Sequence, residues 1–361
     1  MGIWSDFCRE LERAGACIDR PETPGDEIDR AEGYRYLTRL LRMGLDLTLE
    51  FADPRHPELI LAQAKHFGDG GNTADCIYLH AVVDGRLRYR LHGTRGEAPL
   101  MEIGLYAGRI GLDPTSRRVD ALREDQIVVG ADGNIDVAFG DGSNATNTLR
   151  SEDAANYLFI RQYAHDWFRT RPASLRLEVV GDELADPAPA NTAPLTLDAT
   201  ASSLQRAARF VNDAAVAWAA VVDNARRGPV NVFNAVPEDM DMTLPSGHRF
   251  AFGHFDLADD EALVVEFEPP EVPYWGLTIN NYWFEVVDYG SHGSHLNNRT
   301  AEREGDGSVR VVISAQRPMV ANWIDTRGHR VGALVFRWSR TALPLPALAT
   351  RVVAVGDLAT T

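Results

Sequence analysis

Two aromatic-rich stretches near the C-terminal end place the strongest constraint on the fold of this chain. The first, at residues 274–300, reads YWGLTINNYWFEVVDYGSHGSHLNNRT, and the second, at residues 321–338, reads ANWIDTRGHRVGALVFRW. Four of the seven tryptophans lie in them, and the segment VRVVIS at Val309–Ser314 lies between them. Aromatic and β-branched residues favour pleated strands. The pattern therefore predicts strands joined by a polar loop of His, Ser and Asn, as at one end of a β-sandwich.

Further short strands are predicted on both sides of the middle of the chain. In the C-terminal third, apolar runs predict strands at His248–Leu257, Ala262–Glu268, Trp275–Ile279, Tyr282–Val287, Val331–Trp338 and Ala349–Val355. Upstream, strands are predicted at Cys76–Val83, Leu87–His92 and Ala98–Tyr106, with a hairpin of Ile127–Val129 and Ile135–Phe139. Because turn signals separate neighbouring runs, the upstream strands are expected to form an antiparallel meander.

Four helices are predicted from the spacing of apolar residues and from capping residues. They cover Ser5–Ala14, Asp26–Phe51, Glu152–Thr170 and Thr200–Ala225. Ser5 or Asp6 is expected to cap the first helix, since both side chains accept hydrogen bonds from a first helical turn. The proline-containing segment Asp182–Leu197 is expected to be a linker or a surface loop.

Together these elements predict a mainly β protein with helical additions (α+β). Its expected architecture is an antiparallel β-sandwich or jelly roll with N-terminal and central helices. The expected regions are a helical region at 1–72, a β meander at 73–145, a helical and linker segment at 146–228, and a jelly-roll domain at 229–361. A single sandwich built from 73–145 and 229–361 is an open alternative, because a surface connection tolerates a helical insertion.

Charge and composition limit the expected partners and compartment. A formal net charge of -16 disfavours a nucleic-acid partner, whose phosphates need a basic surface. The sequence shows neither an apolar run of about 18 residues nor a signal-peptide pattern. The three cysteines have neither CxxC spacing nor a disulfide pattern. We therefore expect a soluble, cytoplasmic protein with no cofactor and no membrane partner, which binds a small molecule or glycan; homo-oligomerisation is left open.

Four short motifs follow one another in a characteristic order in the C-terminal third. They are Trp275–Thr278, Asn298-Arg299, Asp306–Ile313 and Asn322-Trp323. In this order the region Phe250–Ser339 resembles the uncharacterised family numbered 1214 among the domains of unknown function. The resemblance implies a β jelly roll and no established reaction. Commoner members carry a recognisable partner domain upstream, whereas the first two-thirds of this chain reads only as strands and helices.

The loop after the first aromatic strands concentrates side chains that suit acid–base or metal chemistry. His292 and His295 lie three residues apart. A metal site would need a third ligand, which Asp288, Glu285 or His329 could supply. Solvent-exposed loop histidines are the simpler interpretation.

Glu285 is the carboxylate of most interest, because it follows the aromatic residues Tyr282 and Trp283 closely. An apolar neighbour such as tryptophan raises the pKa of a carboxyl group, which suits a general acid. A salt bridge from Glu285 to Arg299 or Arg337 is the alternative interpretation.

We hypothesise an enzyme, a hydrolase or lyase, that acts on a small or medium hydroxylated substrate such as a glycoside by carboxylate and histidine acid–base chemistry. The catalytic candidates are Glu285, Asp288, His295 and His292, and the substrate-binding candidates are Trp283, Tyr282, Asn298, Arg299, Asn322 and Trp323. This hypothesis assigns no metal ligand. Two alternatives remain: a non-catalytic ligand-binding or assembly protein with an aromatic β face, and a metal-dependent cupin-like enzyme that uses His292 and His295.

Overall fold

The computed structural model describes residues 2–63, 70–109, 113, 116–140, 146–181, 195–236, 248–287, 293–339 and 346–360. The chain divides into two units. Unit 1 consists of Met1–Cys17, Leu37–Gln63 and Cys76–Ala215, and unit 2 consists of Ile18–Tyr36, Ala64–Asp75 and Val216–Thr361. Each described sheet takes its strands from one unit alone, so the segments 73–145 and 229–361 form separate sheets.

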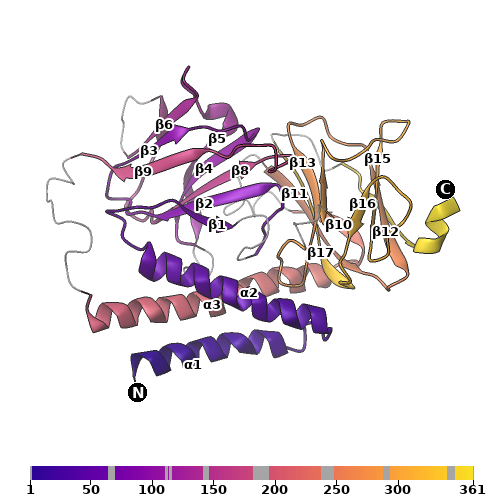
Figure 1. The fold of residues 1–361 in the computed structure, drawn as a ribbon, viewed down its shortest axis with the longest axis horizontal. Helices are drawn as coiled ribbons and strands as arrows, with labels where there is room; N and C mark the ends of the chain where they lie inside the picture. Colours follow the sequence, from indigo (N-terminus) through magenta and orange to yellow (C-terminus); the bar gives the residue numbers. More distant parts are fainter. Residues whose placement is uncertain are drawn as a thin grey trace. The chain divides into compact units, whose positions relative to one another are not determined.

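The described strands of unit 1 form two sheets (Figure 1). The strands are β1 (Ile60–Gln63), β2 (Cys76–Val82), β3 (Tyr89–Thr94), β4 (Leu100–Ala107), β5 (Arg117–Arg123), β6 (Asn134–Phe139), β7 (Asn147–Leu149), β8 (Tyr157–Tyr163) and β9 (Ser174–Val179). One sheet has the order β1-β2-β8-β4-β5 and the other the order β7-β6-β3-β9. All pairs are antiparallel except β6 with β7, which is parallel.

The apolar faces of these two sheets pack against each other. Leu91 of β3 and Val137 of β6 come from one sheet, Ile103 of β4 and Ile160 of β8 come from the other, and all four are buried in one cluster. Side chains alternate between the two faces of a strand, so the neighbours of these residues lie on the opposite face. The two sheets of unit 1 therefore form a β-sandwich around this cluster.

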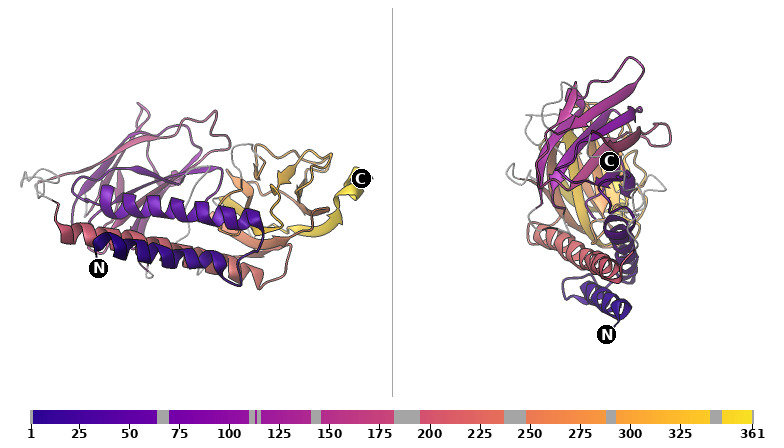
Figure 2. Two further views of the ribbon diagram at one scale, coloured as in Figure 1. Left: turned by 60° about the horizontal axis from the view of Figure 1, so that its bottom comes forward. Right: turned by 90° about the vertical axis from the view of Figure 1, so that its left-hand side faces the viewer.

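Within the described residues, three α-helices accompany the sheets. They are α1 (Ile3–Gly15), α2 (Glu27–Leu45), which continues as a π-helical turn at Asp46–Glu50, and α3 (Leu197–Arg226). In unit 1, Phe7 of α1 packs against Leu41 of α2 and Leu204 of α3, and Figure 2 shows α1 running along α3. None of the helices in the described part of the chain is long and apolar enough to cross a membrane.

The first helix begins earlier than its predicted cap. Gly2 is the N-cap residue, and it makes no side-chain hydrogen bond. The prediction of Ser5 or Asp6 as the cap is therefore wrong. Asp6 instead lies in the first turn, where its negative charge interacts favourably with the positive end of the helix dipole.

The described strands of unit 2 also form two sheets. Its strands are β10 (Val232–Ala235), β11 (His248–Asp256), β12 (Glu261–Phe267), β13 (Trp275–Asn280), β14 (His295–Asn297), β15 (Val309–Ser314), β16 (Trp323–Asp325), β17 (Val331–Ser339) and β18 (Ala349–Ala354). The sheet orders are β10-β11-β17-β13-β14 and β16-β15-β12-β18. Only β15 and β16 pair in parallel among these strands.

The two sheets of unit 2 enclose an apolar core. Phe255, Leu277 and Phe336 come from one sheet, Leu263 and Val311 come from the other, and all are buried in one cluster. Successive strands move repeatedly from one sheet to the other, as in a jelly roll. The predicted fold class, a mainly β sandwich or jelly roll with N-terminal and central helices, is confirmed.

The largest error of the sequence prediction concerns Glu152–Thr170. This segment was predicted as a helix, but Tyr157–Tyr163 is strand β8 at the centre of a sheet. Almost every residue of β8 is buried, because one of its faces meets the sandwich core and the other carries packed aromatic residues. A strand buried on both faces lacks the alternation that distinguishes it from a helix. Among its described residues, the segment 146–228 is thus helical only over Leu197–Arg226.

Strand order within unit 1 also differs from the prediction. The upstream strands do not form a meander, because β2 pairs with β1 and β8 whereas β3 pairs with β6 and β9. The predicted strand at Ile127–Val129 is absent, and the short 3₁₀ helix at Glu124–Gln126 precedes this segment instead. The predicted linker falls mainly on residues 182–194, which lie outside the described residues.

Candidate functional site

The loop after β13 is shaped by Asn281. Its side-chain Oδ1 accepts the backbone N–H groups of Trp283 and Glu285, each at 3.0 Å. The backbone N–H of Asn281 donates to the carbonyl of Glu285 at 2.8 Å. Phe284 has a φ of 59°, in a region that few non-glycine residues adopt. A turn therefore follows β13, and the strand predicted at Tyr282–Val287 is wrong.

The two aromatic residues of this loop are buried against helices of unit 2. The indole N–H of Trp283 donates to the carbonyl of Asp29 at 2.7 Å, and the ring stacks on Tyr36 at a centroid distance of 5.9 Å. The hydroxyl of Tyr282 donates to Asp223 at 3.0 Å. Burial and the neighbouring Asp223 carboxylate raise the pKa of Tyr282 to about 12. Both aromatic rings thus anchor the loop to α2 and α3.

Replacing Gly33 by alanine tests how tightly the loop is packed on α2. An added Cβ would overlap the Trp283 ring and would lie 2.6 Å from Cδ1 of Ile18. We expect a loss of about 1–3 kcal/mol in the free energy of unfolding, because overpacking outweighs the better helix propensity of alanine. Urea denaturation measures this change. The matched control is Gly15→Ala in α1, where a Cβ meets nothing within 4 Å and no loss is expected.

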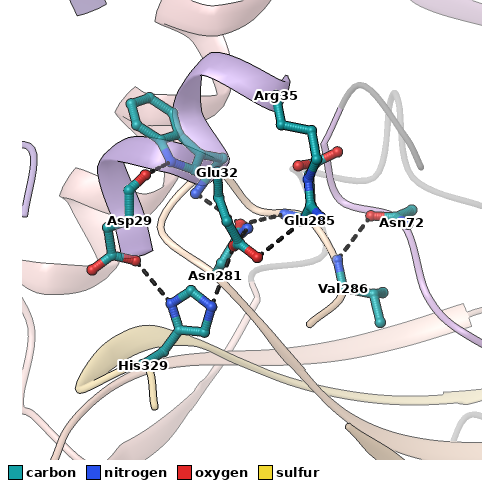
Figure 3. A network of polar contacts seen from close by, with 9 residues as sticks. Asp29, Glu32, Arg35, Asn72, Asn281, Glu285, Val286 and His329 are labelled. Carbon is teal, nitrogen blue, oxygen red and sulfur yellow. Dashed lines mark hydrogen bonds and ion pairs between the residues drawn. The ribbon is translucent and has the colours of Figure 1, made fainter. Parts of the chain in front are cut away.

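A histidine between two carboxylates joins this loop region to α2 (Figure 3). Nδ1 of His329 lies 2.9 Å from Oδ1 of Asp29, and its Nε2 lies 3.2 Å from Oε2 of Glu32. Asp29 and Glu32 are three residues apart in α2, so both point from one face of the helix. Asn281 donates to Glu32 as well, and Arg35 forms an ion pair with Glu32 at 2.9 Å.

The charges of this network follow from its geometry. Burial lowers the pKa of His329, but its hydrogen bonds to Asp29 and Glu32 and their negative charges outweigh burial and raise that pKa to about 9. Burial raises the pKa of Glu32, but the hydrogen bond from His329 prevails, and the net pKa is lowered. At neutral pH a positively charged ring therefore lies between two carboxylates. Metal binding needs a neutral imidazole, so this arrangement does not suit the ligand role considered for His329.

A second polar cluster in unit 2 surrounds the buried carboxylate of Asp75. The hydroxyl of Tyr274 donates to its Oδ2 at 3.0 Å, and the amide of Asn297 lies 3.2 and 3.1 Å from its two oxygens. Nε2 of His295 lies 3.3 Å from Oδ1 of Asp75, and both side chains are almost fully buried. Gly276 makes room for this arrangement, because a Cβ there would overlap the Tyr274 hydroxyl.

The local sequence explains why these side chains meet. His295 and Asn297 are two residues apart in β14, so they point to the same side of the strand. β14 pairs with β13, which begins directly after Tyr274. Asp75 precedes β2 and is the last residue of its segment in unit 2. Residues from three separate parts of the sequence thus share one site.

Glu285 lies in the loop network rather than at Asp75, and it is buried. Figure 3 shows it in the same group as Asn281 and Arg35. Its backbone is held by Asn281. Two other predicted catalytic residues, Asp288 and His292, lie outside the described residues.

Most of the predicted substrate-binding residues have structural contacts. Asn298 donates to the carbonyl of Pro273, and Asn322 bonds the backbone of Glu302 at 2.8 and 2.7 Å. The indole N–H of Trp323 donates to the hydroxyl of Ser314 at 3.1 Å. Arg299 is exposed. Among the described residues, no group of three His, Cys, Asp or Glu side chains is placed to hold a metal ion.

Comparison with known proteins finds one family model and several similar solved structures. The model of the family described as "Protein of unknown function (DUF1214)" matches residues 255–342. The crystal structure of an uncharacterised protein from Burkholderia cenocepacia is similar, with a TM-score of 0.91 and 33% identity over 99% of this chain and 98% of that one. A protein from Vibrio parahaemolyticus gives a TM-score of 0.49 and 11% identity over 95% of this chain and 100% of that one. No curated protein matches the sequence.

The fold and the two polar clusters define a protein of two β-sandwich units with added helices. The family match and the sequence identity to the Burkholderia cenocepacia protein identify the family: the chain belongs to the DUF1214 family. The resemblance inferred from the four short motifs is thereby confirmed.

Proposed function

We propose that the protein is a hydrolase or lyase that acts on a small or medium hydroxylated substrate, with glycosides as the first class to test. The observation that carries the proposal is the pair of Asp75 and His295, whose carboxylate oxygen and ring nitrogen lie 3.3 Å apart in a buried setting. A carboxylate that orients an imidazole and stabilises its protonated form serves general acid–base catalysis. In this proposal Asp75, and not Glu285 as in the sequence hypothesis, is the carboxylate of the acid–base pair.

In this proposal each residue of the site has a stated part. Tyr274 and Asn297 donate to Asp75, so its carboxylate is held in a fixed orientation. Because Nε2 of His295 faces Asp75, Nδ1 is the nitrogen that would exchange a proton with a substrate hydroxyl. Proton transfer by a positioned histidine contributes about 10²–10⁴-fold to a rate.

The test is a screen of aryl glycosides and aryl esters with the full chain, followed by variants on any substrate that is turned over. We expect His295→Gln and Asp75→Asn to lower kcat by about 100-fold or more, with a small change in KM. The matched control is His254→Gln, because His254 is also buried in unit 2 but bonds the carbonyl of Gly332 at 2.9 Å. The control is expected to keep its activity.

Two results would overturn the proposal. One is full activity in a folded His295→Gln protein, which would remove the proton-transfer role. The other is a wild-type protein that binds members of the panel without converting any of them, which would favour the non-catalytic alternative. That alternative assumes an aromatic face open to a ligand or partner. Tyr282 and Trp283, its two main residues, are buried and do not contribute to such a face.

A further inference from the structure

Unit 1 has a buried polar surface that the proposed function does not use. We call it the polar face; it lies on the β1-β2-β8-β4-β5 sheet, opposite the sandwich core, and consists of Tyr78, His80, Glu102, Tyr106, Tyr157, Phe159 and Arg161. Strand register places Tyr78, Arg161 and Glu102 in one row across β2, β8 and β4. All seven are buried except Phe159, which is half-buried.

The polar face contains a buried ion pair. Nη1 of Arg161 donates to Glu102 at 2.7 Å and to the hydroxyl of Tyr106 at 2.8 Å. The guanidinium also lies 4.4 Å from the centre of the Phe159 ring. Apolar side chains of similar volume are often at least as stabilising as a buried ion pair. The opposite face of the same strands carries the apolar sandwich core, including Ile103, Leu158 and Ile160, so packing of this sheet in the sandwich does not depend on the polar residues.

His80 carries an unsatisfied ring nitrogen in this surface. The side chain has no solvent exposure, and its Nδ1 lies 2.7 Å from the hydroxyl of Tyr157. Its Nε2 has no hydrogen-bond partner within the described ranges of the chain. Burial and the positive charges of Arg109 and Arg42 hold the pKa of His80 well below its usual value, so the ring is neutral. A buried polar atom without a partner costs about 1–3 kcal/mol, which a ligand group would recover.

Positive charge and aromatic rings lie near His80. The guanidinium of Arg109 lies 5.0 Å from the centre of the Tyr157 ring and 5.3 Å from that of Phe210 in α3. It also contacts the sulfur of Met43 in α2. Both helices contribute these residues within unit 1. A positive environment favours an anionic group, and rigid aromatic faces favour a planar ring.

We propose that the polar face of unit 1 binds a small aromatic carboxylate. In this arrangement the Tyr157 hydroxyl donates to Nδ1 of His80, and the N–H at Nε2 of His80 donates to the ligand carboxylate. The charge of Arg109 favours the same carboxylate, and the ligand ring packs among the aromatic side chains of β8. This site is distinct from the pair Asp75 and His295, which belongs to unit 2.

The test uses the full-length protein and four simple probes: benzoate, phenylacetate, acetate and benzyl alcohol. We expect benzoate or phenylacetate to raise the Tm in a concentration-dependent and saturable way, since a ligand that binds only the folded state stabilises it. Acetate lacks the ring and benzyl alcohol lacks the charge, so neither is expected to raise Tm at the same concentrations. In His80→Phe the response to benzoate should disappear. The control His92→Phe changes a half-buried histidine of β3 and should keep the response.

A second measurement covers the case in which His80→Phe does not fold. Wild-type protein labelled with ¹⁵N at histidine is titrated with benzoate, and the ring nitrogens are followed by NMR. We expect the Nε2 signal of one neutral histidine to move as benzoate saturates. Unchanged histidine signals and an unchanged Tm with both aromatic carboxylates would overturn the proposal. So would an equal response to benzyl alcohol, which would indicate apolar binding alone.

Discussion

Replacing His329 by leucine is expected to lower the free energy of unfolding by about 3–5 kcal/mol. The wild-type ring lies between the buried carboxylate of Asp29 and the partly buried carboxylate of Glu32, and it hydrogen-bonds or pairs with both. Leucine fills a similar volume but leaves these two negative charges without the cation between them. Urea denaturation at pH 7, followed by tryptophan fluorescence, measures the change, and Trp283 lies directly beside this network.

The same network predicts a loss of stability at alkaline pH. The pKa of His329 is raised from 6.5 to about 9 in the folded protein. Its contribution, on the order of 3 kcal/mol, is therefore complete below pH 6.5, falls between pH 6.5 and 9, and is absent above that range. The lowered pKa of Glu32 acts in the opposite direction, because its contribution is present above its ordinary value of 4.5 and is lost as the pH falls. His329→Leu should abolish the alkaline part of this dependence.

A surface pair provides the matched control for His329. His56 lies 3.1 Å from Asp53, but both side chains are substantially exposed. Solvent screens such a pair, so His56→Leu should leave the denaturation midpoint unchanged. Equal effects of the two substitutions would show that the loss at His329 does not arise from burial of the carboxylates. An unchanged alkaline stability in His329→Leu would show that the ring is not charged in the folded protein.

The strands of unit 2 could be predicted well because their signals are local. Val309–Ser314 was predicted with its observed bounds, and Ala349–Val355 differs from β18 by one residue. Both are short β-branched runs flanked by turn residues. Glu152–Thr170 failed for the opposite reason: its strand is buried on both faces, so its apolar run fits a helix or a strand equally well.

The polar clusters could be predicted only in part, because their members are far apart in the sequence. His295 stood out in a loop of polar residues, and Glu285 stood out because it closely follows two aromatic residues. Asp29 and Glu32 are ordinary acidic residues of an amphipathic helix, and their partner His329 is about 300 residues away. Asp75 follows a glycine-rich stretch of sequence, and none of its sequence neighbours indicates that it pairs with His295. Only tertiary packing shows that these carboxylates lose their solvent and gain partners.

The buried ion pair of Arg161 and Glu102 in unit 1 allows a prediction about stability. Arg161→Met is expected to lower the free energy of unfolding by about 3–5 kcal/mol, because it leaves the carboxylate of Glu102 buried without its cation. The hydroxyl of Tyr106 loses its donor in the same variant. Urea denaturation of the full chain again provides the measurement.

The double variant Arg161→Met/Glu102→Leu distinguishes two causes of destabilisation: loss of the ion pair itself, and the buried Glu102 carboxylate that Arg161→Met leaves unpaired. If the destabilisation comes from the unpaired carboxylate, the double variant should recover most of the lost stability and come close to the wild type. Arg171→Met is the surface control, because Arg171 pairs with Glu97 in an exposed position and its loss should not move the midpoint. A double variant as unstable as Arg161→Met would show that the ion pair itself holds β4 and β8 together. A double variant of wild-type stability would mean that the pair adds little to folding.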